Sequence, residues 1–250
     1  MKKKYIFLLI IIAIPLYYKL AYPDYTYRYR MTVEIDTPEG TKSGSSVIEV
    51  HTEQWPEGLR NLFGGKTAHS TVKGEAVFVD LGSGKNVVAL LTHGRYSEFH
   101  GARKLAPRTF ITNKIDTYDS AEKAGMLVKM TGEKQELTGN LIPTIVTFDD
   151  TKEPESLSVV YAADVNWDNE PNTTIFDNME AKFGSGYKFR AANIQLTGDP
   201  LEDKLDTYLP WVNNFQECKK AWRKIGHAPG KRQIGHPQWT FKINGEFPVK

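Results

Sequence analysis

Residues 25–36, YTYRYRMTVEID, alternate strictly between apolar and polar side chains. Successive side chains of a strand leave opposite faces of its sheet, so this period of two predicts a β-strand with one buried face. The TPEG sequence that follows predicts a turn, with Pro38 in its second position and Gly40 in the left-handed position after it. Residues 45–52, SSVIEVHT, are the expected hairpin partner.

A second hairpin is predicted over residues 74–91, GEAVFVDLGSGKNVVALL. Its arms are residues 75–81 and 87–91, and GSGKN is the turn between them. The second arm is apolar at each position, which predicts a central strand covered on both faces. Further strands are predicted at 142–148, 157–162 and 187–197, and an edge strand at 238–243, QWTFKI.

Helical patterns are fewer than strand patterns. Residues 120–137 are rich in helix formers, although Gly125 and Gly132 weaken the pattern. Residues 174–184, TIFDNMEAKFG, predict a short helix with Gly184 directly after its last turn.

One more helix is predicted in residues 199–211, with Asp199 as N-cap and Pro200 in the first helical position. Residues 94–118 have no clear period and are interpreted as loop. The elements together predict an α+β fold with a mainly antiparallel sheet and a few short helices.

The start of the chain has a different pattern. Three lysines at 2–4 precede an apolar run of 14 residues, and residues 5–22 are interrupted only by Lys19, which can extend to the membrane interface. A secretory signal peptide should end in small residues, whereas this run ends in the aromatic sequence YYKLAYPDY, which is typical of an interfacial belt. The pattern favours an uncleaved signal anchor at 1–23. A cleaved signal and a buried helix of a soluble protein are the alternatives.

The lysines ahead of the apolar run place the N-terminus in the cytoplasm by the positive-inside rule. The sequence therefore predicts a single-pass protein of a bacterial inner membrane, with a bilayer contact through residues 5–22. By the length prior, residues 24–250 are expected to form one extracytoplasmic α+β domain in the periplasm, with two small domains as the alternative.

Charge and cysteine content exclude several classes of protein. Without Lys2, Lys3, Lys4 and Lys19, 28 basic residues stand against 30 acidic ones, so there is no basic excess for nucleic acid. Cys218 is the only cysteine, which excludes an intrachain disulfide and a cysteine-based zinc site. We interpret it as a small apolar residue on a helix, with an intermolecular bridge as the alternative.

Catalytic motifs are weak. The sequence DLGSGKN has Val79 and Asn86 where a phosphate-binding loop needs Gly and Ser or Thr, so it is interpreted as a hairpin turn. Ser45 and Ser46 are potential nucleophiles, but no G-x-S-x-G elbow surrounds either of them. The histidines that could serve as their base are His51, His69 and His93.

Metal-binding patterns are also incomplete. The six histidines have no tight ligand spacing, and His93 and His100 flank GRYSEF in a segment interpreted as loop. In residues 164–172, DVNWDNEPN, oxygen ligands recur as in the start of an EF-hand, at Asp164, Asn166, Asp168 and Glu170. Ile175 stands where the bidentate Glu belongs. We therefore expect an acidic surface loop, no metal and no cofactor.

Several of these segments resemble a family of uncharacterised proteobacterial proteins. They are YTYRYRMTVEIDTPEGTKSGSSVIEV, GEAVFVDLG with VVALL, LIPTIVTF and LPW. The family shares an N-terminal hydrophobic segment and a YRYR…TPEG…GSSVIEV block. The resemblance covers most of residues 1–211, and residues 164–178 are interpreted as an insertion. It implies a bacterial origin and an anchor, and it implies no activity.

Two classes of function follow from these patterns. The first is a membrane-anchored envelope protein that acts by binding a protein or another envelope partner. The alternative is an envelope hydrolase whose site is assembled from dispersed residues, with the His93–His100 segment and the acidic segment 164–170 as its candidates. No catalytic residue can be assigned from the sequence.

Overall fold

The computed structural model describes residues 11, 13, 17–56, 58, 68–93, 101–111, 121–165, 173–226 and 237–245. Its strands are β1 (Tyr25–Thr37), β2 (Gly40–Gln54), β3 (Ala68–Glu75), β4 (Val77–Gly82), β5 (Lys85–His93), β6 (Lys134–Glu136), β7 (Pro143–Phe148), β8 (Leu157–Val165), β9 (Thr173–Asp177), β10 (Lys188–Thr197) and β11 (Lys242–Gly245). Its helices are α2 (Gly101–Phe110), α3 (Ala121–Lys129), α4 (Met179–Phe183), α5 (Leu205–Tyr208) and α6 (Phe215–Gly226), with short 3-10 turns η2 (Gly139–Leu141), η3 (Pro154–Ser156) and η4 (Gln238–Thr240).

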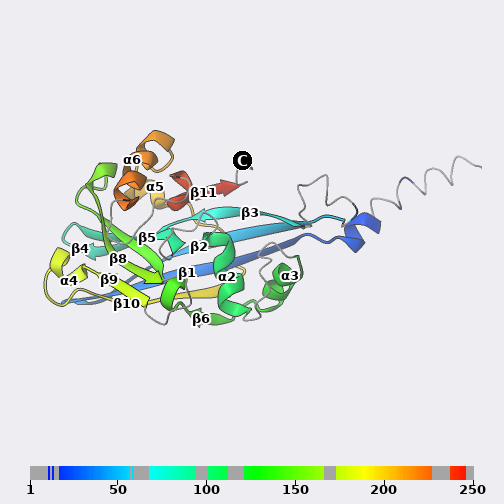
Figure 1. The fold of residues 1–250 in the computed structure, drawn as a ribbon, viewed down its shortest axis with the longest axis horizontal. Coiled ribbons are helices and arrows are strands. Elements are labelled where there is room, and N and C mark those ends of the chain that lie inside the picture. The colour runs from blue at the N-terminus through cyan, green and yellow to red at the C-terminus, as the bar shows by residue number, and fades with distance from the viewer. Residues whose placement is uncertain are drawn as a thin grey trace, which may run out of the picture.

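The strands form two antiparallel sheets with short helices around them (Figure 1). Sheet A has six strands in the order β11-β3-β2-β1-β10-β6, and sheet B has five in the order β4-β5-β7-β8-β9. The predicted α+β class with mainly antiparallel pairing is confirmed.

The hydrophobic core consists of two layers. The larger cluster joins the inner face of sheet A, one face of sheet B, and helices α2 and α3. The second cluster lies on the other face of sheet B, which α5, α6 and the residues between and after them cover. Sheet B is therefore enclosed on both faces, whereas sheet A has an inner face and an outer, polar face.

The first predicted hairpin is confirmed. The odd residues of β1 from Tyr27 to Ile35 are buried and the even ones are partly exposed. Thr37 pairs with Gly40 across a two-residue turn, and Gly40 has a φ of +112°, as its left-handed position requires. The hairpin is longer than predicted because β2 continues to Gln54.

The second hairpin is also confirmed, although its first arm begins at Val77. The structure instead places Glu75 at the end of β3, a strand that the sequence did not predict. Between the two strands the N–H of Ala76 donates to the carbonyl of Phe241 at 2.7 Å, and the chain passes from sheet A to sheet B. A side chain at Gly74 would lie only 3.0–3.2 Å from Ile48 and the carbonyl of Val47, so glycine permits this crossing.

Two of the helix and loop predictions need correction. The segment 94–118 was interpreted as loop, yet residues 101–110 form α2, which packs Leu105 and Ala106 into the core despite the internal Pro107. The predicted helix 120–137 ends at Lys129 in α3, and β6 follows. Gly132, with a φ of +101°, lies in the turn between them.

The predicted helix 174–184 is wrong in its first half. Residues 173–177 form β9 because they pair with β8, with Ile175 opposite Ala163. The second half is confirmed as α4. Gly184 follows its last turn with a φ of +105°, and its N–H donates to the carbonyl of Glu180 at 2.9 Å.

The C-terminal predictions are partly correct. Cys218 is buried on α6, as its interpretation as a small apolar helix residue requires. The predicted edge strand 238–243 begins as η4, and the strand itself is β11, at an edge of sheet A. The predicted helix 199–211 is wrong, because residues 198–204 have no regular secondary structure and only α5 is helical.

Residues 17–21 are helical and lead into β1. Of the predicted anchor, residues 5–10, 12 and 14–16 lie outside the part of the chain that the structure describes. In the described part of the chain, no helix has both the length and the apolar character that a membrane crossing requires.

Candidate functional site

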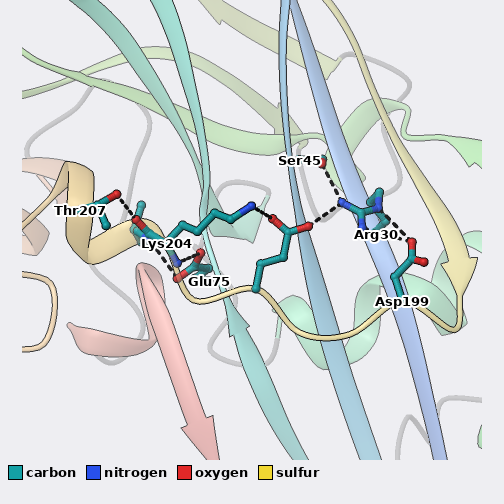
Figure 2. Close-up of polar contacts among 8 residues, drawn as sticks. Arg30, Ser45, Glu75, Asp199, Lys204 and Thr207 are labelled. Carbon is teal, nitrogen blue, oxygen red and sulfur yellow. Dashed lines mark hydrogen bonds and ion pairs between the residues drawn. The ribbon is translucent and has the colours of Figure 1, made fainter.

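The densest polar network of the described residues lies on the outer face of sheet A. Residues 198–204, which we call the strap, have no regular secondary structure, connect β10 to α5 and cross this face. Figure 2 shows the strap running past β1, β2 and β3, with charged side chains of both the strap and the strands directed toward each other.

Arg30 of β1 holds one end of the strap. Its guanidinium donates to Asp199 Oδ2 at 3.1 Å, to Glu202 Oε1 at 3.0 Å and to Ser45 Oγ at 2.9 Å. The hydrogen bond to Glu202 is the main reason that the pKa of Arg30 is raised. The pKa of Asp199 is lowered by its hydrogen bond with Thr197 and by Arg30, and that of Glu202 by Lys204 and Arg30.

Glu75 holds the other end of the strap. Its buried carboxylate accepts the backbone N–H of Lys204 at 2.9 Å and that of Leu205 at 3.1 Å. These N–H groups begin α5, so Glu75 caps this helix from a distant strand. Burial raises the pKa of Glu75, although the two N–H bonds and nearby Lys242 act in the opposite direction.

A third attachment comes from β11. The buried side chain of Lys242 donates to Asp203 Oδ1 at 2.5 Å. The strap is therefore fixed to β1, β3 and β11, three strands of sheet A. Val47 of β2 lies opposite Arg30 on the outer face and is fully buried. We attribute its burial to the strap, which spans from Arg30 to Glu75 on either side of β2.

This network explains why Asp199 does not begin a helix. Its carboxylate is bound to Arg30, and its N–H donates to Thr197 Oγ1 at 3.1 Å. The contact between Arg30 and Asp199 joins positions 169 residues apart, so no local pattern could reveal it. Glu75 carried a weak signal, as the lone acidic residue in the apolar sequence GEAVFV.

The chemistry of the network is that of a structural clamp. Both carboxylate oxygens of Glu75 accept backbone N–H groups, and the charge of Arg30 is matched by two carboxylates. A general base needs an oxygen free to receive a proton from substrate. The carboxylate of Glu75 does not meet this requirement while the strap is in place.

The predicted serine and histidine candidates have other partners. Ser45 Oγ accepts from Arg30, whereas Ser46 points to the opposite, buried side of β2. His51 Nδ1 lies 2.8 Å from Thr26 Oγ1, and His69 stacks on Trp55. In these contacts neither serine is paired with a histidine that could act as its general base.

His93 is buried at the end of β5, with Nδ1 2.8 Å from the carbonyl of Asn140. It lines a small cavity between β5 and α2, together with Tyr29, Met31, Leu90, Leu91, Thr92, Ala102, Leu105, Leu141 and Pro143. No carboxylate is among these lining residues. The Tyr29 hydroxyl donates to the Ala102 carbonyl at 2.6 Å, and burial raises its pKa far above the usual value. His100 lies outside the described residues.

Most of the acidic segment 164–170 lies outside the described residues. Asp164 belongs to β8, but Asn166, Asp168 and Glu170 lie outside the described residues. Across the described ranges, no group of three or more His, Cys, Asp or Glu side chains could hold a metal ion.

The edges of the sheets differ in how they are protected. In sheet A, β6 is three exposed residues with two charges and β11 is four residues with Lys242. In sheet B, β4 lies against β2, where a side chain at Gly44 would meet the carbonyl of Phe78. Short length, charge and cover are common protections of edge strands.

Strand β9 (Thr173–Asp177) is the other edge of sheet B. It pairs with β8 alone among the described strands, contains no lysine, and exposes 55% of Ile175. The sequence missed this surface because the segment was predicted as helix. The run Thr173, Thr174 and Ile175 was the available signal, since β-branched residues favour strands.

Comparison of the chain with protein-family models, with curated proteins and with solved structures finds no match.

Proposed function

We propose that this protein is a single-pass envelope protein of a bacterial inner membrane that binds a protein partner through the edge of sheet B. The apolar run 5–22 would anchor it, and the lysines at 2–4 would keep its N-terminus in the cytoplasm. The domain that follows would then lie in the periplasm. The resemblance of residues 25–50 to proteins with an N-terminal hydrophobic segment supports this arrangement.

The edge strand β9 carries the binding half of the proposal, because it pairs with β8 alone among the described strands. An edge strand presents a row of backbone N–H and C=O groups that can pair with an extended segment of another chain. Exposed Ile175 offers an apolar contact beside that row. The partner that fits is an extended protein segment with an apolar residue at the matching position.

The position of β9 supports the same function. In Figure 1, β9 lies at the end of the domain opposite to the N-terminal helix. An anchored domain would hold this edge away from the membrane surface, where the segment of a partner can reach it. The carboxylates of the strap are bound to Arg30, Lys204 and Lys242, so no observation in the described residues favours the hydrolase.

The anchor is tested by a reporter fused after Lys250. We expect a reporter that works only outside the cytoplasm to be active, and the chain to stay in the membrane fraction at its uncleaved mass. Release of a shorter chain that begins near Tyr22 would contradict the anchor.

The binding edge is tested by affinity capture from membranes with the full chain, followed by reconstitution with the purified partner. Ile175→Lys adds the charge that protects other edge strands, and Glu180→Lys adds it on exposed α4 nearby as a matched control. We expect binding to be lost only with Ile175→Lys, at an unchanged melting temperature. Equal binding by both variants and wild type would rule out β9 as the binding edge.

A further inference from the structure

The end of the domain that carries Tyr25 must lie close to the bilayer if residues 5–22 are the anchor, so this inference rests on the proposed function. Tyr22 ends the apolar run and Tyr25 begins β1. Three residues span at most about 10 Å when extended. Each polar layer of a bilayer is about 5–8 Å thick, so the start of β1 lies at or just above the headgroups.

Helix α3 packs against this end of the domain. A side chain at Gly125 would come within 3.0 Å of the ring of Tyr25, so the glycine lets the helix approach the start of β1 closely. Figure 1 shows α3 at the same end of the domain as the N-terminal helix. Gly125, which weakens the helical pattern in the sequence, therefore permits the close packing of α3 against Tyr25.

The side of α3 that faces away from the core is partly apolar. Ala121, Ala124 and Leu127 are buried, whereas Met126 is 47% exposed, with the exposed Glu122 one turn before it on the same side. Lys129 is exposed in the last turn. Apolar side chains flanked by lysine are typical of helices that lie in a membrane interface, where the long cationic side chain reaches the headgroups.

Trp55 lies at the same end of the domain. Tyr25 pairs with Thr52 in the β1–β2 ladder, and Trp55 follows three residues later, just beyond the end of β2. Its ring stacks on His69, with ring centroids 5.7 Å apart. Tryptophan is enriched at membrane interfaces because its ring is apolar and its N–H is polar.

We infer that Trp55 and α3 form a second membrane contact, which seats the domain in the headgroup layer of the bilayer that holds the anchor. Met126 extends toward the acyl chains and Lys129 toward the phosphates. One helix alone would leave the domain free to tilt, whereas this contact fixes its orientation. In that orientation β9 points away from the membrane.

The test uses a fluorophore attached to an introduced cysteine in the full chain. Cys218 does not interfere, because it is buried and burial raises the pKa of its thiol to about 12. Met126→Cys and the control Ile175→Cys are each labelled with a polarity-sensitive dye. Both positions are exposed and apolar, and the elements that carry them, α3 and β9, lie toward opposite ends of the domain in Figure 1. The chains are reconstituted in phosphatidylcholine and phosphatidylglycerol vesicles with and without nitroxide-labelled lipid.

We expect a blue-shifted emission at position 126 and quenching by nitroxide lipid that is several-fold stronger than at position 175. Vesicles that float with the chain while both dyes report water would overturn the second contact and leave the anchor intact. A chain that does not float with vesicles, and is extracted by alkaline carbonate, would overturn the anchor and this contact with it.

Discussion

Sheets A and B are both antiparallel, but their surroundings differ. In sheet B, β5 is buried at every position after Lys85, because sheet A covers one face and α6 lies over the other. In sheet A, β1 alternates between buried and partly exposed residues, because the core covers its inner face and the strap covers only part of its outer face. The burial pattern along a strand therefore reports how many faces of its sheet are covered, and the uncovered face is where the charged residues gather.

The largest effect should come from β5, where the comparison predicts that neighbouring positions are equally sensitive. Val87 packs toward sheet A and Val88 toward α6. Val87→Asp and Val88→Asp each bury an unpaired charge, so each should lower the free energy of unfolding by about 3–5 kcal/mol. Urea unfolding of the full chain in detergent measures this. A mild effect of Val88→Asp would show that α6 does not seal that face.

In β1 the comparison predicts that substitutions at neighbouring positions have unequal effects on the free energy of unfolding. Val33→Asp places a charge in the core between the sheets and should cost about 3–5 kcal/mol. Thr32→Asp, on the outer face, should change the free energy of unfolding by no more than about 0.5 kcal/mol. The same unfolding measurement serves here. Equal losses at both positions would show that the outer face of sheet A is covered as well.

These two strands were predictable because their patterns are local. The alternation of β1 and the apolar run of β5 depend on which faces are covered, and a sequence records this directly. Strand β3 was missed because its sequence AHSTVKGE contains few apolar residues. Helix α2 was missed because Pro107 and the basic residues obscure its period.

Other features depend on contacts between distant segments. Residues 173–177 have both strand and helix character, and pairing with β8 decides between them. The strap is not helical because Arg30 and Glu75 bind it from strands more than a hundred residues away. The binding edge and the clamp could therefore be recognised only once the strands were placed, whereas the anchor rests on the sequence alone.

The clamp provides an intermediate effect. Glu75→Gln keeps the size of the side chain but leaves one acceptor oxygen for two backbone N–H groups. The unsatisfied N–H should cost about 1–3 kcal/mol in the free energy of unfolding. Glu49→Gln is the matched control, since Glu49 lies on the same outer face without a helix to cap. A loss at Glu75 no larger than that of the control would show that the strap is held by other contacts.

The same variant has a predicted pH dependence. Burial raises the pKa of Glu75, so the folded protein binds this proton more tightly than the unfolded chain does. The resulting stability is fully present below the usual Glu pKa of about 4.3 and is lost as the pH rises through the raised value. The loss caused by Glu75→Gln should therefore be larger at about pH 4 than at about pH 7. An equal or smaller loss at the lower pH would contradict the raised pKa.

The smallest effect should come from a single pair on the outer face of sheet A. Arg28 Nε and Nη2 both lie 2.7 Å from Glu49 Oε2, and the two residues are opposite each other in the β1–β2 ladder. Cross-strand ion pairs that reach solvent contribute about 0.2–1 kcal/mol, and salt screens them. In a double-mutant cycle of Arg28→Gln and Glu49→Gln, we expect a coupling within that range that decreases at about 1 M salt. A salt-independent coupling above about 2 kcal/mol would mean that this face is shielded from water, and the contrast between the two sheets would not hold.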